Sequence, residues 1–150
     1  MIENERNIQI QLGMHFGVNR GYTVIPNIKM DYGCYEADFC YINQNNFLTE
    51  VEIKISISDF KADFKKKNFH NCDHVRSLYY AMPFSMWQKH KEVISEMVKS
   101  VGAGVIIAGN TSPHVVIRAA VRDVKPLTTQ ELINYMRIGC LKWCARAWYE

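Results

Sequence analysis

The chain has 150 residues, of which 48% are hydrophobic and 22% charged, the balance of an average globular protein. This length suits one domain, residues 1–150, with a core large enough to fold without a disulfide or structural metal, and the composition excludes collagen-like, low-complexity and wholly disordered chains. The net charge is +3, but residues 1–60 carry four basic against eight acidic groups and residues 61–150 carry 14 against seven. A metal-dependent enzyme that acts on a polyanion would need an acidic cluster beside a basic surface. Chance also produces such an uneven distribution of charge.

Segments for export or membrane insertion are not predicted. The longest weakly polar run, Val101 to Gly109, has nine residues, against about 20 for a membrane-spanning helix. The N-terminal sequence MIENERNIQIQ is polar and lacks the apolar core of a signal peptide. With five cysteines and no CxxC pair, we expect reduced thiols, a cytoplasmic location and no membrane partner.

In the first third of the chain, the pattern predicts one helix and three strands. Ile8, Leu12 and Phe16 recur at helical spacing, so a helix is expected over about residues 2–18. Residues 22–30 are rich in β-formers but contain Pro26, which favours an edge strand. Two further strands, over residues 35–42 and 47–55, flank Asn43–Asn46, whose asparagines favour a hairpin turn.

The rest of the chain alternates helices and strands. Ser56-Ile57-Ser58-Asp59 resembles a capping box that opens a helix reaching about Phe69, and Thr128–Glu131 is a second one that opens a C-terminal helix. Between them we expect strands over 75–82, 103–108 and 114–121, with a helix over 85–100. The order predicts an α/β fold with a central mixed β-sheet flanked by helices.

Charged residues on the strand over 47–55 suggest a site. Because side chains alternate along a strand, Glu50, Glu52 and Lys54 share one face. The preceding hairpin partner brings Asp38 opposite the region of Glu50 to Glu52. Alternating charges are also usual on a half-exposed strand, but charged residues are depleted in strands and costly to bury.

Asp38, followed after thirteen residues by Glu52-Ile53-Lys54, resembles the signature of the PD-(D/E)XK nucleases, with Ala37 in place of the usual proline. A wider block, over about residues 20–125, resembles the MmcB-type DNA-repair endonucleases. It includes EADF, EVEIK, SDFKAD, Cys72-Asp73, LYYAMP and GVIIA. Glu36, where a basic residue is expected, and the longer helix over 85–100 depart from the pattern. The resemblance implies a restriction-endonuclease-like fold.

The same resemblance implies roles for individual residues. Asp38, Glu52 and the carbonyl of Ile53 would bind Mg²⁺ or Mn²⁺, since hard cations prefer oxygen ligands. Lys54 would position the attacking water or stabilise charge on the phosphate. Glu50 would assist as a supporting or second-metal group, and Glu5 or Glu3 would supply the acidic residue that many relatives carry on the first helix.

Lysines after this block are candidates for DNA contact. Lys61, Lys65, Lys66 and Lys67 would bind phosphates, and Ser56 is a weaker candidate because it suits a helix cap better. The alternative is a solvated helix face on which Asp59, Asp63 and Lys67 are neighbours.

These features predict a metal-dependent endonuclease that hydrolyses DNA in repair or processing. The expected partner is DNA, and the chain is compatible with a homodimer or with a recruiting protein partner. One alternative is a non-catalytic nucleic-acid-binding module on the same fold. Another is a zinc-stabilised interaction protein, with ligands from His70, Cys72, His74, Cys140 and Cys144, although their spacing matches no familiar zinc site.

Overall fold

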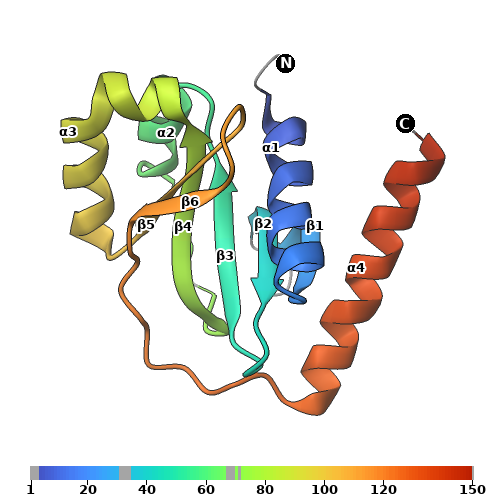
Figure 1. Ribbon diagram of the computed structural model, residues 1–150. Helices are drawn as coiled ribbons and strands as arrows, with labels where there is room; N and C mark the ends of the chain where they lie inside the picture. The colour runs from blue at the N-terminus through green and yellow to red at the C-terminus, as the bar shows by residue number, and fades with distance from the viewer. Residues whose placement is uncertain (1–3, 31–34, 67–69, 71, 150) are drawn as a thin grey trace.

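The computed structural model describes residues 4–30, 35–66, 70 and 72–149. Within these ranges the chain forms a mixed sheet of six strands in the order β1-β2-β3-β4-β5-β6 (Figure 1). The first three strands are antiparallel, β3, β4 and β5 run parallel, and β6 returns antiparallel to β5. The strands are β1 (Thr23–Met30), β2 (Tyr35–Ile42), β3 (Leu48–Ile53), β4 (Val75–Pro83), β5 (Gly104–Ala108) and β6 (His114–Ile117).

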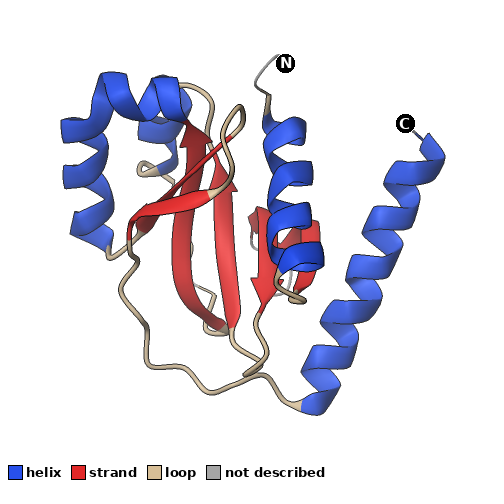
Figure 2. Ribbon diagram, in the orientation of Figure 1, coloured by secondary structure: helices blue, strands red, loops and turns tan. Residues whose placement is uncertain are grey.

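Helices flank this sheet on both faces and at one edge (Figure 2). Helix α1 (Glu5–Leu12), continued by the π-helical turn η1 (Gly13–Asn19), packs on one face. Helices α2 (Ile57–Asp63) and α3 (Phe84–Val101) pack on the other, and α4 (Thr129–Tyr149) packs against β1. The predicted α/β fold, a mixed sheet flanked by helices, is confirmed. None of the described helices is long and apolar enough to cross a membrane.

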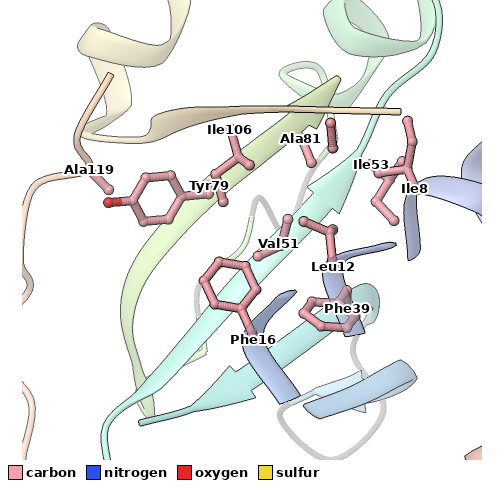
Figure 3. Packing of buried hydrophobic residues seen from close by; sticks show 11 residues of the cluster. Ile8, Leu12, Phe16, Phe39, Val51, Ile53, Tyr79, Ala81, Ile106 and Ala119 are labelled. Carbon is pink, nitrogen blue, oxygen red and sulfur yellow. The ribbon is translucent and has the colours of Figure 1, made fainter. Parts of the chain in front are cut away.

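The core is divided by the sheet, because strand side chains alternate between its faces. On the α1 side, Val51 and Ile53 pack with Ile8, Leu12 and Phe16 (Figure 3). On the opposite side, residues of β4 and β5 pack with α2 and α3, and the cluster includes Phe60, Leu78, Tyr80, Met82, Trp87, Ile94 and Val105. Burial of both faces fixes the register of β3, since a shift by one residue would exchange its two faces.

Local signals in the sequence act as predicted at two helix starts. The Ser56 hydroxyl accepts a hydrogen bond from the amide of Asp59 at the start of α2. At α4, the Glu131 amide donates to the Thr128 hydroxyl, and the Thr128 amide donates to the Glu131 carboxylate. This is a complete capping box, which satisfies amides that the helix itself leaves without partners.

Two predicted boundaries are wrong. The helix expected to reach Phe69 ends at Asp63, because the chain tightens into turns there: the Lys65 amide donates to the carbonyl of Ala62, and the Lys66 amide to that of Asp63. Residues 67–69 lie outside the described residues. Strand β6 ends at Ile117 rather than near residue 121, because the following backbone leaves β5 and the Ala120 amide donates to the carbonyl of Gly102.

Candidate metal centre

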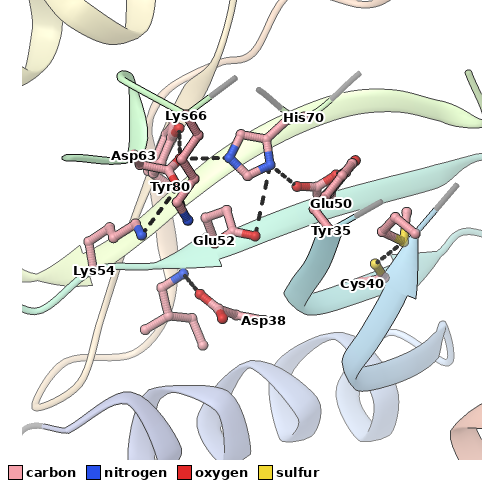
Figure 4. A network of polar contacts seen from close by, with 12 residues as sticks. Tyr35, Asp38, Cys40, Glu50, Glu52, Lys54, Asp63, Lys66, His70 and Tyr80 are labelled. Carbon is pink, nitrogen blue, oxygen red and sulfur yellow. Dashed lines mark hydrogen bonds and ion pairs between the residues drawn. The ribbon is translucent and has the colours of Figure 1, made fainter. Parts of the chain in front are cut away.

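The hairpin of β2 and β3 brings Asp38 to Glu52, as the sequence predicts. Phe39 pairs with Val51, so Asp38 lies opposite Glu52 in the same register. An Asp38 carboxylate oxygen accepts a hydrogen bond from the backbone N–H of Ile53 at 2.8 Å (Figure 4). This contact fixes the Asp38 side chain at the end of β3, where the chain enters the turn toward α2.

Glu50 and Glu52 are both buried on the face of β3 opposite Val51. The Tyr35 hydroxyl donates to Glu50 Oε1 at 2.6 Å, and His70 Nδ1 contacts Glu50 Oε2. Glu52 Oε1 has no hydrogen-bond partner, and His70 Nδ1 lies 3.9 Å from it. A buried carboxylate oxygen without a partner is costly, so Glu52 is the group in this region that a ligand would satisfy.

Asp63, at the end of α2, is fully buried. Its carboxylate contacts one imidazole, one tyrosine hydroxyl and two lysine ammonium groups. Its Oδ2 lies 2.6 Å from His70 Nε2 and accepts from the Tyr80 hydroxyl at 2.5 Å. Its Oδ1 lies 2.8 Å from Lys66 Nζ and 3.5 Å from Lys54 Nζ. Asp63 therefore ties the end of α2 to β3 and β4 and restrains the ammonium group of Lys54. We call Asp38, Glu50, Glu52, Asp63 and His70 the carboxylate cluster.

Burial and charge shift the pKa values within this cluster. Burial, followed by the neighbouring carboxylate of Asp38, raises the pKa of Glu52 from 4.5 to about 9. Burial alone would lower the pKa of His70, but hydrogen bonds to Asp63 and Glu50 outweigh it and raise the pKa to about 9. Burial opposes the charge of Asp63, yet its hydrogen bonds with His70 and Lys66 hold the pKa of Asp63 well below its usual 3.8. Burial therefore favours the protonated form of Glu52, while the surrounding carboxylates favour the charged form of His70.

These donors are suited to a divalent cation. One ligand atom from each of Glu50, Glu52 and His70 lies within 4.8 Å of the others. This set shares Glu52 with the set that the sequence predicts, Asp38, Glu52 and the Ile53 carbonyl. Carboxylate oxygens suit Mg²⁺ and Mn²⁺, while an imidazole nitrogen shifts the preference toward Mn²⁺ or other transition metals. The orphaned oxygen of Glu52 is a donor atom that such an ion would satisfy.

The structure thus brings together most of the residues predicted to act in catalysis or to bind the metal: Asp38, Glu50, Glu52, Ile53 and Lys54. Glu5 is exposed in the first turn of α1. The α1 residue that reaches Asp38 is Gln9, one turn later, whose side-chain amide donates to the Asp38 carbonyl at 2.5 Å. The role of Glu5 remains a prediction, and Glu3 lies outside the described residues.

The predicted DNA-contacting residues have different surroundings. Lys61 and Lys65 are exposed on and just after α2. Lys66 is 61% exposed but bonded to Asp63, and Ser56 caps α2. Lys67 lies outside the described residues.

Asp63, His70, Tyr35 and Tyr80 belong to the site but were missed by sequence reasoning. The sequence offered Asp63 only within the alternative of a solvated helix face, and His70 only as a candidate zinc ligand. The pairing of β3 with β4 places Tyr80 directly beside Glu52, and a tyrosine within an apolar strand was the available signal for it. The zinc alternative gains no support in the described residues, where Cys72 is in the core and His74 pairs with Glu131 at 3.0 Å.

Comparisons with known proteins agree with this fold. A family model described as "DNA repair protein MmcB-like" matches residues 2–144. A solved structure, the SPO1766 protein of unknown function from Silicibacter pomeroyi, matches with a TM-score of 0.59 and 16% sequence identity, covering 97% of this chain and 87% of that chain. At this identity the likeness supports the fold alone. No curated protein matches significantly.

Proposed function

This chain belongs to the MmcB-like family of DNA repair proteins, and we propose that it is a metal-dependent endonuclease that hydrolyses phosphodiester bonds of DNA. The observation that carries the proposal is the position of Glu52. Its buried oxygen without a partner lies in a cluster with Asp38, Glu50 and His70. The negative charge of these buried carboxylates is poorly compensated without a cation, and their oxygens are suited to bind one.

Two groups of ligands meet at Glu52. Asp38, Glu52 and the carbonyl of Ile53 would hold one Mg²⁺ or Mn²⁺ ion, and Glu50 would supply a further carboxylate oxygen beside Glu52. A bound ion would polarise the scissile phosphate and lower the pKa of a water molecule. The hydrogen bond from the Ile53 amide keeps Asp38 oriented toward β3, so the chain pre-organises one of its carboxylates.

Lys54 is the residue best placed to act on the phosphate. Its side chain is 11% exposed, and its ammonium lies 3.5 Å from Asp63. This contact holds the ammonium beside the carboxylates without a short, bidentate pairing. Lys54 would therefore stabilise negative charge that develops on the phosphate, or orient the attacking water.

His70 and the two tyrosines position the carboxylates. His70 joins Glu50 to Asp63 through its two ring nitrogens, while Tyr35 donates to Glu50 and Tyr80 to Asp63. These contacts fix side chains around the ligands, as the outer contacts of metal sites generally do. The exposed Lys61 and Lys65 on and just after α2 would bind DNA phosphates, with Lys66, Lys67 and Ser56 from the same segment as further candidates.

The direct test is cleavage of supercoiled plasmid, duplex, single-stranded, flap and junction DNA, and of RNA, with Mg²⁺, Mn²⁺ or EDTA. Asp38→Asn and Lys54→Met should each lower the rate by about 100-fold or more. Lys89→Met, at an exposed position of α3, is the matched control and should cut normally. Cleavage by either site variant at the wild-type rate would refute the assignment.

A non-catalytic DNA-binding module is the second candidate, and one observation favours it. His70 contacts Glu50 and Asp63 with its two ring nitrogens, and these contacts raise its pKa and favour a charged imidazole, which would offset part of the negative charge within the chain itself. Binding of Mn²⁺ measured by calorimetry separates the two candidates. The nuclease should bind the ion and lose that binding in Glu52→Gln, whereas the module would bind DNA equally well in EDTA and cut none of the substrates.

A further inference from the structure

A concave site lies on the face of the sheet opposite the carboxylate cluster. It is a pocket of about 520 Å³, formed between η1, the strands β2, β3 and β4, and β6. Thr49, Ser77 and Tyr79 line it, and these residues alternate along β3 and β4 with Glu50 and Tyr80. Because alternate side chains point to opposite faces, this pocket and the carboxylate cluster are separated by the thickness of the sheet.

The charged residues that line this pocket are all basic. Arg20, Arg76 and Arg118 are joined there by His15 and His114, and no aspartate or glutamate lines it. In the part of the chain that the structure describes, no carboxylate lies within ion-pair distance of these three guanidinium groups. Three unpaired arginines around one concavity create a site for an anion, and guanidinium groups match phosphate oxygens in geometry.

Aromatic rings form the remaining walls. Phe16, Tyr22 and Tyr41 are stacked nearly parallel, with the Phe16 and Tyr41 centroids 4.1 Å apart. The guanidinium of Arg76 lies 3.8 Å over the ring of Phe47. Phe16 is buried against the two tyrosines, so the rings that a ligand can reach are those of the half-buried Tyr22 and Tyr41. Nucleobases stack on such rings, and tyrosine hydroxyls supply hydrogen bonds at the base edges.

We propose that this basic pocket binds a nucleotide, with its phosphate at Arg20, Arg76 and Arg118 and its base against the aromatic walls. The volume lies within the range of about 300–1,000 Å³ that is usual for small-ligand sites. The ligand is either a free mononucleotide or the 5′-phosphorylated end of a single strand, which present the same chemistry. The proposal rests on this face alone and does not depend on cleavage at the carboxylate cluster.

Binding of two probes tests the site: dAMP, by calorimetry, and a fluorescent single-stranded oligonucleotide with or without a 5′-phosphate, by anisotropy in EDTA. The variant Arg20→Gln/Arg118→Gln changes two exposed side chains and should raise the Kd of a bound probe about tenfold or more. Lys89→Gln/Lys99→Gln removes the same charge from exposed positions of α3 and should change that Kd less than about twofold. Glu52→Gln, in the carboxylate cluster, should bind as the wild type does.

Each outcome decides the proposal. Binding of dAMP identifies a free nucleotide as the ligand, and binding of only the 5′-phosphorylated strand identifies a strand end. Failure of both probes to bind overturns the proposal, as does an equal loss in the lysine control. Equal competition by inorganic phosphate alone would also overturn it, because the aromatic walls would then contribute nothing.

Discussion

The two faces of the sheet differ in charge, although the same strands build them. On the α2 and α3 side, Glu50 and Glu52 are enclosed with Asp63 and His70. On the α1 side, Thr49 and Tyr79 border a pocket with three arginines. One face therefore gathers buried negative groups and the other gathers accessible positive ones.

The difference follows from how far each helix layer extends along the strands. Ile8 and Leu12 of α1 pack over the ends of β3 and β4, at Ile53 and Ala81. The beginnings of the same strands, at Thr49 and Ser77, line the pocket instead. On the opposite face, α2 ends in Asp63, whose side chain joins the polar groups there into one network. Helix α2 thus encloses the polar side chains on one face, whereas α1 leaves the beginnings of β3 and β4 uncovered on the other. The same alternating strands therefore present two chemically distinct surfaces.

Removal of Asp63 should have the largest effect on stability. Asp63→Ala leaves the buried His70 and Tyr80 without their common acceptor, and it removes the carboxylate that Lys54 and Lys66 contact. The free energy of unfolding should fall by about 3–5 kcal/mol, the usual cost of breaking a buried ionic contact from one side. Urea denaturation followed by circular dichroism measures this change.

Asp59→Ala is the matched control, because it removes a carboxylate from an exposed position of the same helix. The free energy of unfolding of this variant should fall by less than about 1 kcal/mol, which is the range of interactions between a charge and a helix terminus. If both variants lost equal stability, Asp63 would be no more than a helix residue and the network would have no structural role.

The second prediction concerns pH. The pKa of His70 is raised from 6.5 to about 9 by its carboxylate partners despite burial, so its stabilising effect is complete below pH 6.5 and is lost as pH rises through 9. Burial and Asp38 raise the pKa of Glu52 from 4.5 to about 9, so the folded state keeps a proton that the unfolded chain releases. Both groups make stability fall with rising pH.

The free energy of unfolding of the metal-free protein should fall by about 3 kcal/mol or more between pH 6 and pH 9, because each of the two shifted groups alone corresponds to roughly that loss. Urea titrations across this range in EDTA measure the loss. His70→Gln should flatten the curve, while His114→Gln, at an exposed position, should leave it unchanged. Stability that rises over this range would contradict the assigned directions.

The third prediction concerns the α1 face. A Cβ atom at Gly104 would lie 2.5 Å from the carbonyl oxygen of Ile117 and 2.5 Å from the ring of Tyr79. Gly104→Ala should therefore cost about 1–3 kcal/mol through overpacking, and it should weaken nucleotide binding because Tyr79 lines the basic pocket. Gly21→Ala, whose Cβ would meet nothing within 4 Å but whose φ is +70°, separates backbone strain from crowding. Unchanged stability in Gly104→Ala would show that β6 shifts easily.

Much of the fold could be predicted because local signals agree with the tertiary structure. The asparagine turn, the two capping motifs and the alternation of Glu50, Val51 and Glu52 each depend on neighbours in the sequence. Once the turn is located, antiparallel pairing of the two strands places Asp38 beside Glu52, so no contact from a distant segment is needed to predict it.

The other half of the site depends on contacts that no local pattern encodes. Helical spacing alone left open a solvated face for Asp63 beside Asp59 and Lys67, whereas its side chain is buried where α2 ends in a turn. His70 joins the cluster through the fold of a distant segment, and Tyr80 through the parallel register of β3 and β4. The basic pocket likewise collects arginines from η1's end, β4 and the segment after β6, which are neighbours only in the folded chain.

The smallest predicted effect compares the lysines of the α2 segment with the arginines of the basic pocket. Lys61 and Lys65 are exposed, so Lys61→Gln/Lys65→Gln should weaken duplex DNA binding only several-fold and lower the salt dependence by about one counterion per lysine. Arg20→Gln/Arg118→Gln should lower duplex affinity less than the lysine double variant does, because the basic pocket lies on the opposite face of the sheet from the carboxylate cluster. Anisotropy titrations at several salt concentrations measure both, with Lys89→Gln/Lys99→Gln as the charge-matched control. If the arginine pair lowered duplex affinity more than the lysine pair, the DNA path would run over the α1 face, and the carboxylate cluster would lie on the wrong side of the sheet to cut it.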